Sequence, residues 1–158
     1  MTWREKEFVE KYELTRHNDE EYAYSSFEAT TENGLPVVII LNADLIKWDD
    51  KPSHPWLLEI MIAYDGNNTN GMPNDAIYEL LEEIETRLTE KLNLGNGFLN
   101  IGRETGGNTR LIYLACKDFR KASKVTDEIA REYRDRIEIS YRIYKDKYWT
   151  SFNHFSFD

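Results

Sequence analysis

The sequence has a single cysteine, Cys116, so no disulfide can form within the chain. Its apolar runs are short, and none approaches the ~20 residues that a membrane-spanning helix needs. The first residues are charged and contain no apolar core of a signal peptide. From these absences we expect a cytoplasmic protein with no disulfide framework and no membrane contact.

The chain also lacks the short motifs that mark common enzyme and cofactor sites. It has no Gly-x-Ser-x-Gly, His-Glu-x-x-His or Cys-x-x-Cys sequence, and no P-loop or dinucleotide-binding glycine pattern. The tightest group of metal-binding types, Asp49, Asp50 and His54, is better explained as solvated loop charges. Cys116 is better explained as a buried structural residue than as a nucleophile. We therefore predict no catalytic residue, no metal ligand and no cofactor, and we lean against an enzyme.

Length and composition predict one globular domain. The chain has 158 residues, which is enough for one sizeable core, and its 41% hydrophobic and 31% charged residues are typical of a folded protein. The net charge of −9 argues against binding to nucleic acid by phosphate neutralisation. We expect one domain over residues 1–158, in which a core at 56–146 lies between an addition at 1–55 and a tail at 147–158.

Residues 56–146 have the pattern of strand, helix, hairpin, helix and strand. Residues 56–64 are nearly all apolar and predict a strand that is buried on both faces. Asn74 or Asp75 can cap the first helix, whose apolar residues recur at steps of three and four. They are Ile77, Leu80, Leu81, Ile84, Leu88 and Leu92.

The second half of this pattern begins with strands at 98–103 and 109–116, joined by the turn residues of 105–108. Asp118 can cap a second helix, and 137–144 alternate as a half-buried strand. The apolar stripe of that helix comprises Phe119, Ala122, Val125, Ile129 and Tyr133. This order predicts an α+β fold with a ferredoxin-like β-α-β-β-α-β core, an antiparallel sheet and both helices on one face.

Residues 1–55 are predicted to be a β-rich addition. A three-stranded β-meander is expected over 8–41, with a hairpin turn at 32–34 and an irregular linker at 42–55. The pattern leaves open whether this meander extends an edge of the sheet or covers its open face.

Charge is spread unevenly over the two expected helices. Residues 56–96 carry eight acids and two bases, whereas 97–158 carry nine acids and twelve bases. We expect the acidic first helix to face the basic second helix, in preference to an anion site on the latter. The bases in question are Arg120, Lys121, Lys124, Arg131 and Arg134.

The hairpin at 102–110 is the one candidate ligand site. Arg103 and Arg110 flank Gly106 and Gly107, and two guanidinium groups beside a glycine turn can hold a phosphate or a carboxylate. Alternatively, the arginines face Glu104 or solvent. The loop leads into a strand, so it is neither a P-loop nor a dinucleotide-binding turn.

The tail at 147–158 is dense in aromatic residues. Trp149 and Phe152 are spaced as in one helical turn, and Phe155 and Phe157 alternate as in a short edge strand. A tail this apolar either folds back on the sheet or meander, or forms a contact surface for another protein or a second copy.

Several short segments, taken together, resemble one bacterial family. They are PWLL at 55–58, NGMP at 70–73, IETRL at 84–88, GRET at 102–105 and YWTSF at 148–152. Over nearly its whole length the chain resembles the domain-of-unknown-function family 695, in which the domain also occurs beside a domain similar to the regulator of ribonuclease E activity. The resemblance implies a small cytoplasmic bacterial protein, and it carries over no catalytic residue because the family has none assigned.

Two functional hypotheses follow. The first is a non-catalytic protein-interaction or regulatory module whose partner is an unknown protein or a second copy. The alternative is a protein or enzyme that binds a small anionic ligand between meander and core, with the hairpin region 102–110 supplying the contacts.

Overall fold

The computed structural model describes residues 12–18 and 23–155, and for 12–18, 23, 46 and 153–155 it describes the backbone alone. The described residues form seven strands, all in one sheet. The strands are β1 (Tyr12–Asn18), β2 (Ala23–Thr30), β3 (Pro36–Asn42), β4 (Trp56–Ala63), β5 (Phe98–Gly106), β6 (Thr109–Cys116) and β7 (Glu138–Lys145). The helices are α1 (Ala43–Ile46), α2 (Asp75–Lys91) and α3 (Phe119–Tyr133), with short 3-10 segments η1 (Lys51–Ser53), η2 (Leu94–Asn96) and η3 (Thr150–Phe155).

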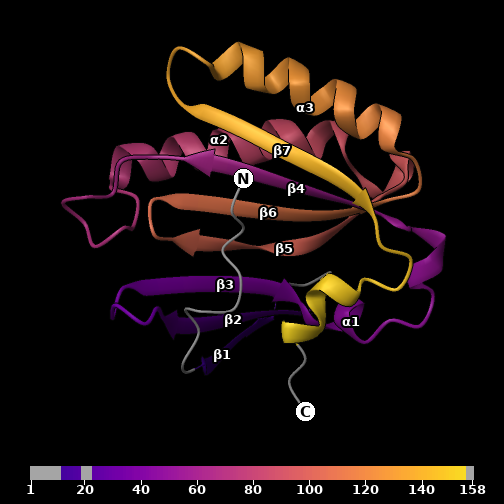
Figure 1. Cartoon of the computed structure of the whole chain (residues 1–158), viewed down its shortest axis with the longest axis horizontal. Helices are drawn as coiled ribbons and strands as arrows, with labels where there is room; N and C mark the ends of the chain where they lie inside the picture. Colours follow the sequence, from indigo (N-terminus) through magenta and orange to yellow (C-terminus); the bar gives the residue numbers. More distant parts are fainter. Residues whose placement is uncertain (1–11, 19–22, 156–158) are drawn as a thin grey trace.

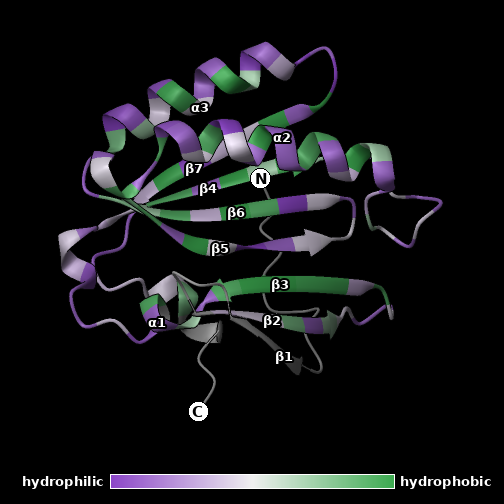
Figure 2. Ribbon diagram, turned by 180° about the vertical axis from the view of Figure 1, so that it is seen from behind, coloured by the Kyte–Doolittle hydropathy of each residue, from purple (hydrophilic) through white to green (hydrophobic). Residues whose placement is uncertain are grey.

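The sheet is antiparallel throughout, in the order β1-β2-β3-β5-β6-β4-β7. Strand β4, which the sequence predicts to be buried on both faces, lies between β6 and β7, so it has a neighbour on each side. Helices α2 and α3 pack on one face of this half of the sheet (Figures 1 and 2). The mixed helix and strand content confirms the α+β prediction.

Local sequence signals explain where the main helices and the central hairpin begin. The side chain of Asn74 accepts a hydrogen bond from the backbone of Ile77 and caps α2, and Asp118 caps α3 in the same way through Arg120. The β5–β6 hairpin turns through Gly107 and Asn108, whose φ angles are +59° and +68°. Two consecutive residues with positive φ match the right-handed twist of the strands that they join.

The meander extends the sheet at the β5 edge, which settles the alternative that the sequence leaves open. Strand β3 pairs with β5 over five residues, from Val37–Gly106 to Leu41–Gly102. Both glycines have φ near +150° (+151° for Gly106 and +155° for Gly102), a region that side chains with a Cβ atom rarely adopt. A Cβ atom on Gly102 would overlap the carbonyl oxygen of Ile40, so β3 docks this closely only against glycine.

Two apolar clusters lie on opposite faces of the sheet. The first joins α2 and α3 to β4 and β6 through residues such as Leu58, Ile84 and Ile129. The second joins β2 and β3 to the other face of β4, β5 and β6, and it includes Trp149 and Phe152 from the tail. Cys116 is buried in the first cluster, and burial raises the pKa of its thiol to about 12.

Two expectations about the helices are wrong in detail. Phe119 was expected in the buried stripe of α3, but it is 42% exposed because it begins the helix and lies against the ring of Trp56. The ion pairs between the helices run mainly from bases of α2 to acids of α3, namely Arg87–Glu132 at 2.7 Å and Lys91–Glu128 at 4.0 Å. These ion pairs depend on where each charged residue lies along its helix. They do not follow from the net charges of the two segments.

We predict that Gly102→Ala lowers the free energy of unfolding by at least about 2 kcal/mol, because a residue forced into this backbone region costs about 1–3 kcal/mol and the clash with β3 adds to it. Urea denaturation measures the difference. Gly95→Ala is the matched control, since its Cβ atom would meet nothing closer than 3.4 Å and Gly95 has no positive φ. Equal losses in both variants would contradict the proposed close approach of β3.

Candidate functional site

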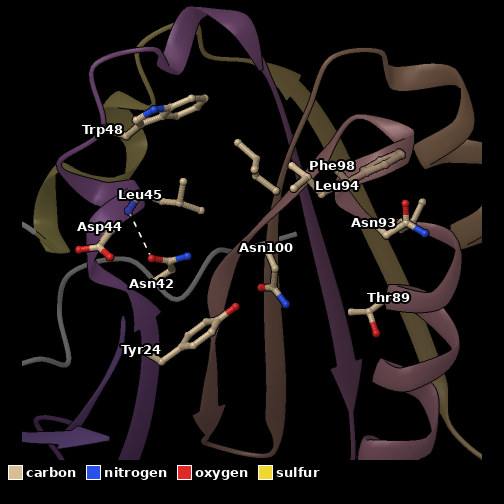
Figure 3. A pocket seen from close by; sticks show the side chains of 12 residues that line it. Tyr24, Asn42, Asp44, Leu45, Trp48, Thr89, Asn93, Leu94, Phe98 and Asn100 are labelled. Carbon is tan, nitrogen blue, oxygen red and sulfur yellow. Dashed lines mark hydrogen bonds between the residues drawn. The ribbon is translucent and has the colours of Figure 1, made fainter. Parts of the chain in front are cut away.

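A pocket of about 330 Å³ opens where the meander, the start of β5 and the end of α2 meet (Figure 3). Its walls draw on both apolar clusters, because Leu92 and Phe98 belong to the helix-side cluster. Leu45, Trp48 and Leu99 pack against the cluster on the other face. The described residues that line it are Tyr24, Asn42, Asp44, Leu45, Trp48, Thr89, Leu92, Asn93, Leu94, Phe98, Leu99 and Asn100.

Three uncharged polar side chains meet at one end of this pocket. Tyr24 on β2 and Asn42 on β3 are cross-strand partners and therefore share a face of the sheet. Asn100 is on β5, where it lies opposite Leu114 of β6. Figure 3 shows the hydroxyl of Tyr24 and the two amides turned toward one another. Asn42 is only 4% exposed, and its oxygen caps α1 by accepting a hydrogen bond from Leu45 at 3.4 Å. We refer to Tyr24, Asn42 and Asn100 as the polar end of the pocket.

The opposite end of the pocket is apolar. Leu45, Trp48 and Leu99 are half-buried there, and Leu94 on η2 is 63% exposed. A leucine this exposed beside a half-buried tryptophan leaves apolar surface in water that a ligand can cover. We refer to Trp48, Leu94 and Leu99 as the apolar end.

The ring of Trp48 packs against two other aromatic side chains. Its ring centroid lies 5.8 Å from that of His54 and 5.9 Å from that of Trp149. The indole of Trp149 donates a hydrogen bond of 2.8 Å to the carbonyl oxygen of His54, so the tail is tied to the loop before β4.

His54 is the most constrained member of this cluster. It is 5% exposed, its Nδ1 lies 2.9 Å from Ser53 Oγ, and its Nε2 has no hydrogen-bond partner among the described residues. Burial, with help from the nearby Lys117 ammonium, lowers the pKa of His54 below its usual value. The ring is therefore neutral near pH 7.

The structure gives the two hairpin arginines carboxylate partners within the chain. Arg103 contacts Glu85 at 2.6 Å and Glu82 at 2.9 Å, and Arg110 contacts the same oxygen of Glu82 at 3.0 Å. Burial opposes the charge of Arg103, but the two carboxylates outweigh it and raise its pKa, whereas burial and the neighbouring Arg103 lower the pKa of Arg110. These acids lie on α2, where no local sequence signal connects them to the hairpin.

The ligand role of Arg103, Arg110, Gly106 and Gly107 stays a prediction. Both guanidinium groups donate hydrogen bonds to carboxylates of α2. Gly107 forms the turn and Gly106 lies against β3, where a Cβ atom would come within 2.5 Å of the Pro36 oxygen. The hairpin thus holds α2 and β3 to the sheet.

The tail residues expected at a protein contact are divided. Trp149 is 1% exposed and Phe152 is 4% exposed, and Phe152 lies edge-on to Tyr113 at 5.2 Å. Both therefore fold back on the sheet, the first of the two alternatives that the sequence allows. The side chain of Phe155 and all of Phe157 lie outside the described residues.

A buried carboxylate that no sequence motif marks lies in the middle of β4. Glu59 is 2% exposed, it pairs with Arg142, and it accepts a hydrogen bond of 2.7 Å from Tyr144, whose hydroxyl also lies 2.8 Å from Ser151 in η3. Burial raises the pKa of Glu59 despite these partners. A single acid inside an apolar run is the signal that could have revealed it, because such a group is buried only with partners.

The described residues contain no group of three or more metal-binding side chains, and no helix among them is long and apolar enough to cross a bilayer. In comparisons with known proteins, the model of a family described as "Family of unknown function (DUF695)" matches residues 11–157. No curated protein and no solved structure matches the chain significantly.

We predict that stability falls as the pH drops below about 6.5, the ordinary pKa of histidine, because the unfolded chain then takes up a proton that buried His54 does not. One such group changes the free energy of unfolding by at most about 1.4 kcal/mol per pH unit. Urea denaturation from about pH 7.5 to about pH 5.5 measures the slope. His54→Gln should flatten it, and an unchanged slope in that variant would assign the effect to other groups.

Proposed function

This chain belongs to the DUF695 family, whose function is unknown, and we propose that it binds a small molecule in the pocket between the meander and α2. One observation carries the proposal: the neutral side chains of Tyr24, Asn42 and Asn100 meet at one end of the pocket, and apolar side chains lie at the other. Of these apolar side chains, Leu94 is exposed. Ligand sites in proteins combine apolar walls with a few converging polar groups, and they start at about 300 Å³.

The chemistry of the lining supports binding without turnover. Among the described residues that line the pocket, Asp44 on the exposed rim is the one carboxylate, and none is a histidine, cysteine or lysine. Proton transfer to and from a substrate needs a positioned acid or base with a matched pKa. We therefore propose a non-catalytic, regulatory role in which the bound molecule is sensed and not converted.

A second candidate function is protein interaction, which a different observation favours. Phe119 is 42% exposed and lies 4.9 Å from the half-buried ring of Trp56, with Arg120 above one ring and Lys145 above the other. Aromatic and arginine side chains are typical of the centres of protein interfaces. The partner would be another protein or a second copy of this chain.

We further infer that residues 56–146 form a ferredoxin-like core within one domain and that the protein is cytoplasmic. The first inference is supported by the strand order β5-β6-β4-β7, with α2 between β4 and β5 and α3 between β6 and β7. The second is supported by a sole cysteine that is free and buried.

We predict that uncharged fragments shift the backbone amide resonances of 42–48 and 89–100 in a two-dimensional NMR screen. Thr89→Trp, which places an indole in the pocket, should weaken the binding of these fragments at least about tenfold. That corresponds to a loss of about 1.4 kcal/mol in the free energy of binding. Thr86→Trp is the matched control, because Thr86 is exposed on the same helix and does not line the pocket. Fragments whose shifts map elsewhere, or that bind both variants equally, would rule out the pocket as the site.

For the second candidate we predict that Phe119→Ser weakens self-association at least about tenfold, because an anchor residue at the centre of an interface contributes about 2 kcal/mol or more. Sedimentation over a range of protein concentrations measures it, with the exposed Tyr148 changed to Ser as the control. A chain that is monomeric at every concentration would exclude a second copy as the partner.

A further inference from the structure

The side chains around the pocket also point to the chemical class of its ligand. Resting on the proposed function, we propose that the ligand is an uncharged molecule of about ten non-hydrogen atoms, sized by the volume per water molecule. One end of this molecule carries an amide-like donor and acceptor, and the other end is flat and apolar.

The size follows from the volume of the pocket. A cavity of about 330 Å³ holds the volume of about ten water molecules at ~30 Å³ each. A single ring with one polar substituent fills such a space. A nucleotide or a lipid chain would extend beyond this volume.

The absence of charge follows from the lining. None of the described residues in the lining is a lysine, an arginine or a histidine, so an anion would lose its water without gaining a cation. Asp44 lies on the exposed rim and adds a negative charge, as does the net charge of −9. Arg103 and Arg110, the cations of the ligand site that the sequence predicts, contact α2 carboxylates and do not line the pocket.

The amide-like group follows from the polar end. Each asparagine amide offers two donor hydrogens and one acceptor oxygen, and a tyrosine hydroxyl can do either. The oxygen of Asn42 already caps α1, and Figure 3 shows its amide nitrogen on the pocket side, where it can donate to a ligand carbonyl. Asn100 and Tyr24 then supply the acceptor for a ligand N–H group.

The flat apolar group follows from the apolar end. Trp48 presents an indole ring whose position is fixed by His54 and Trp149, so the wall is already formed before a ligand arrives. Leu94 and Leu99 complete this end. Aromatic rings bind preferentially to such preformed planar and branched apolar surfaces.

Three probes of one shape and different charge test this assignment. Benzamide is neutral and carries the donor and acceptor, benzoate is its anionic analogue, and benzamidine is its cationic analogue. NMR titration of the full chain measures each dissociation constant through the amide resonances of 42–48 and 89–100. We expect benzamide to bind at least about tenfold more tightly than benzoate and more tightly than benzamidine, because only benzamide pairs with the polar end without a buried charge.

Variants connect the preference to named side chains. Tyr24→Phe and Asn100→Leu should each weaken the binding of benzamide at least about threefold and leave the affinity for benzoate unchanged. Each change therefore reduces the selectivity of the pocket for the neutral probe. Tyr148→Phe is the matched control, because Tyr148 is 61% exposed and does not line the pocket. Spectra of each variant without ligand show whether it is folded.

The outcomes separate this inference from the function on which it rests. If uncharged fragments bind in the pocket but benzoate or benzamidine binds as tightly as benzamide, the proposed ligand class is wrong. The proposal that the pocket binds a small molecule then still stands. If neither benzamide nor any fragment shifts the pocket resonances, the proposed function fails and the ligand class fails with it. Selectivity that survives both Tyr24→Phe and Asn100→Leu would also overturn the assignment.

Discussion

The pairing of β3 with β5 is the contact on which the rest of the molecule depends. It joins the meander and the core in one sheet, and Gly102 and Gly106 permit it because a side chain at either place would collide with the backbone of β3. The same pairing carries the end of β3 toward the end of α2. Without it, Tyr24 and Asn42 would have no opposite wall, and the pocket would be open surface.

Much of this fold could be predicted from the sequence, because its signals are local. The periodicity of β4, α2, β6 and α3, the caps at Asn74 and Asp118 and the turn at Gly107 each depend on a few neighbouring residues. The placement of the meander could not be predicted, since either face or edge satisfies its alternation. The close approach of β3 to Gly102 determines where the meander lies. The sequence alone does not reveal this contact, because a glycine in a strand can also mark a bulge or a bend.

The candidate site was harder to predict for the same reason. The sequence pointed to Arg103 and Arg110 because charges beside glycines are conspicuous, but their partners come from another helix. The pocket is built from common residues, such as Asn42 and Asn100, that acquire meaning only when four segments meet. Leu94 follows a helix end and matches no periodic pattern, so its exposure is visible only in three dimensions.

Trp48 belongs to two structures at once. One side of its ring lines the pocket, and the ring also packs against Trp149, whose burial fixes the aromatic tail to the sheet. The position of the Trp48 ring therefore affects both the free energy of filling the pocket and the free energy of docking the tail. By thermodynamic reciprocity, a molecule that prefers one position of this indole changes the docking equilibrium of η3 by the factor by which η3 changes the affinity for that molecule.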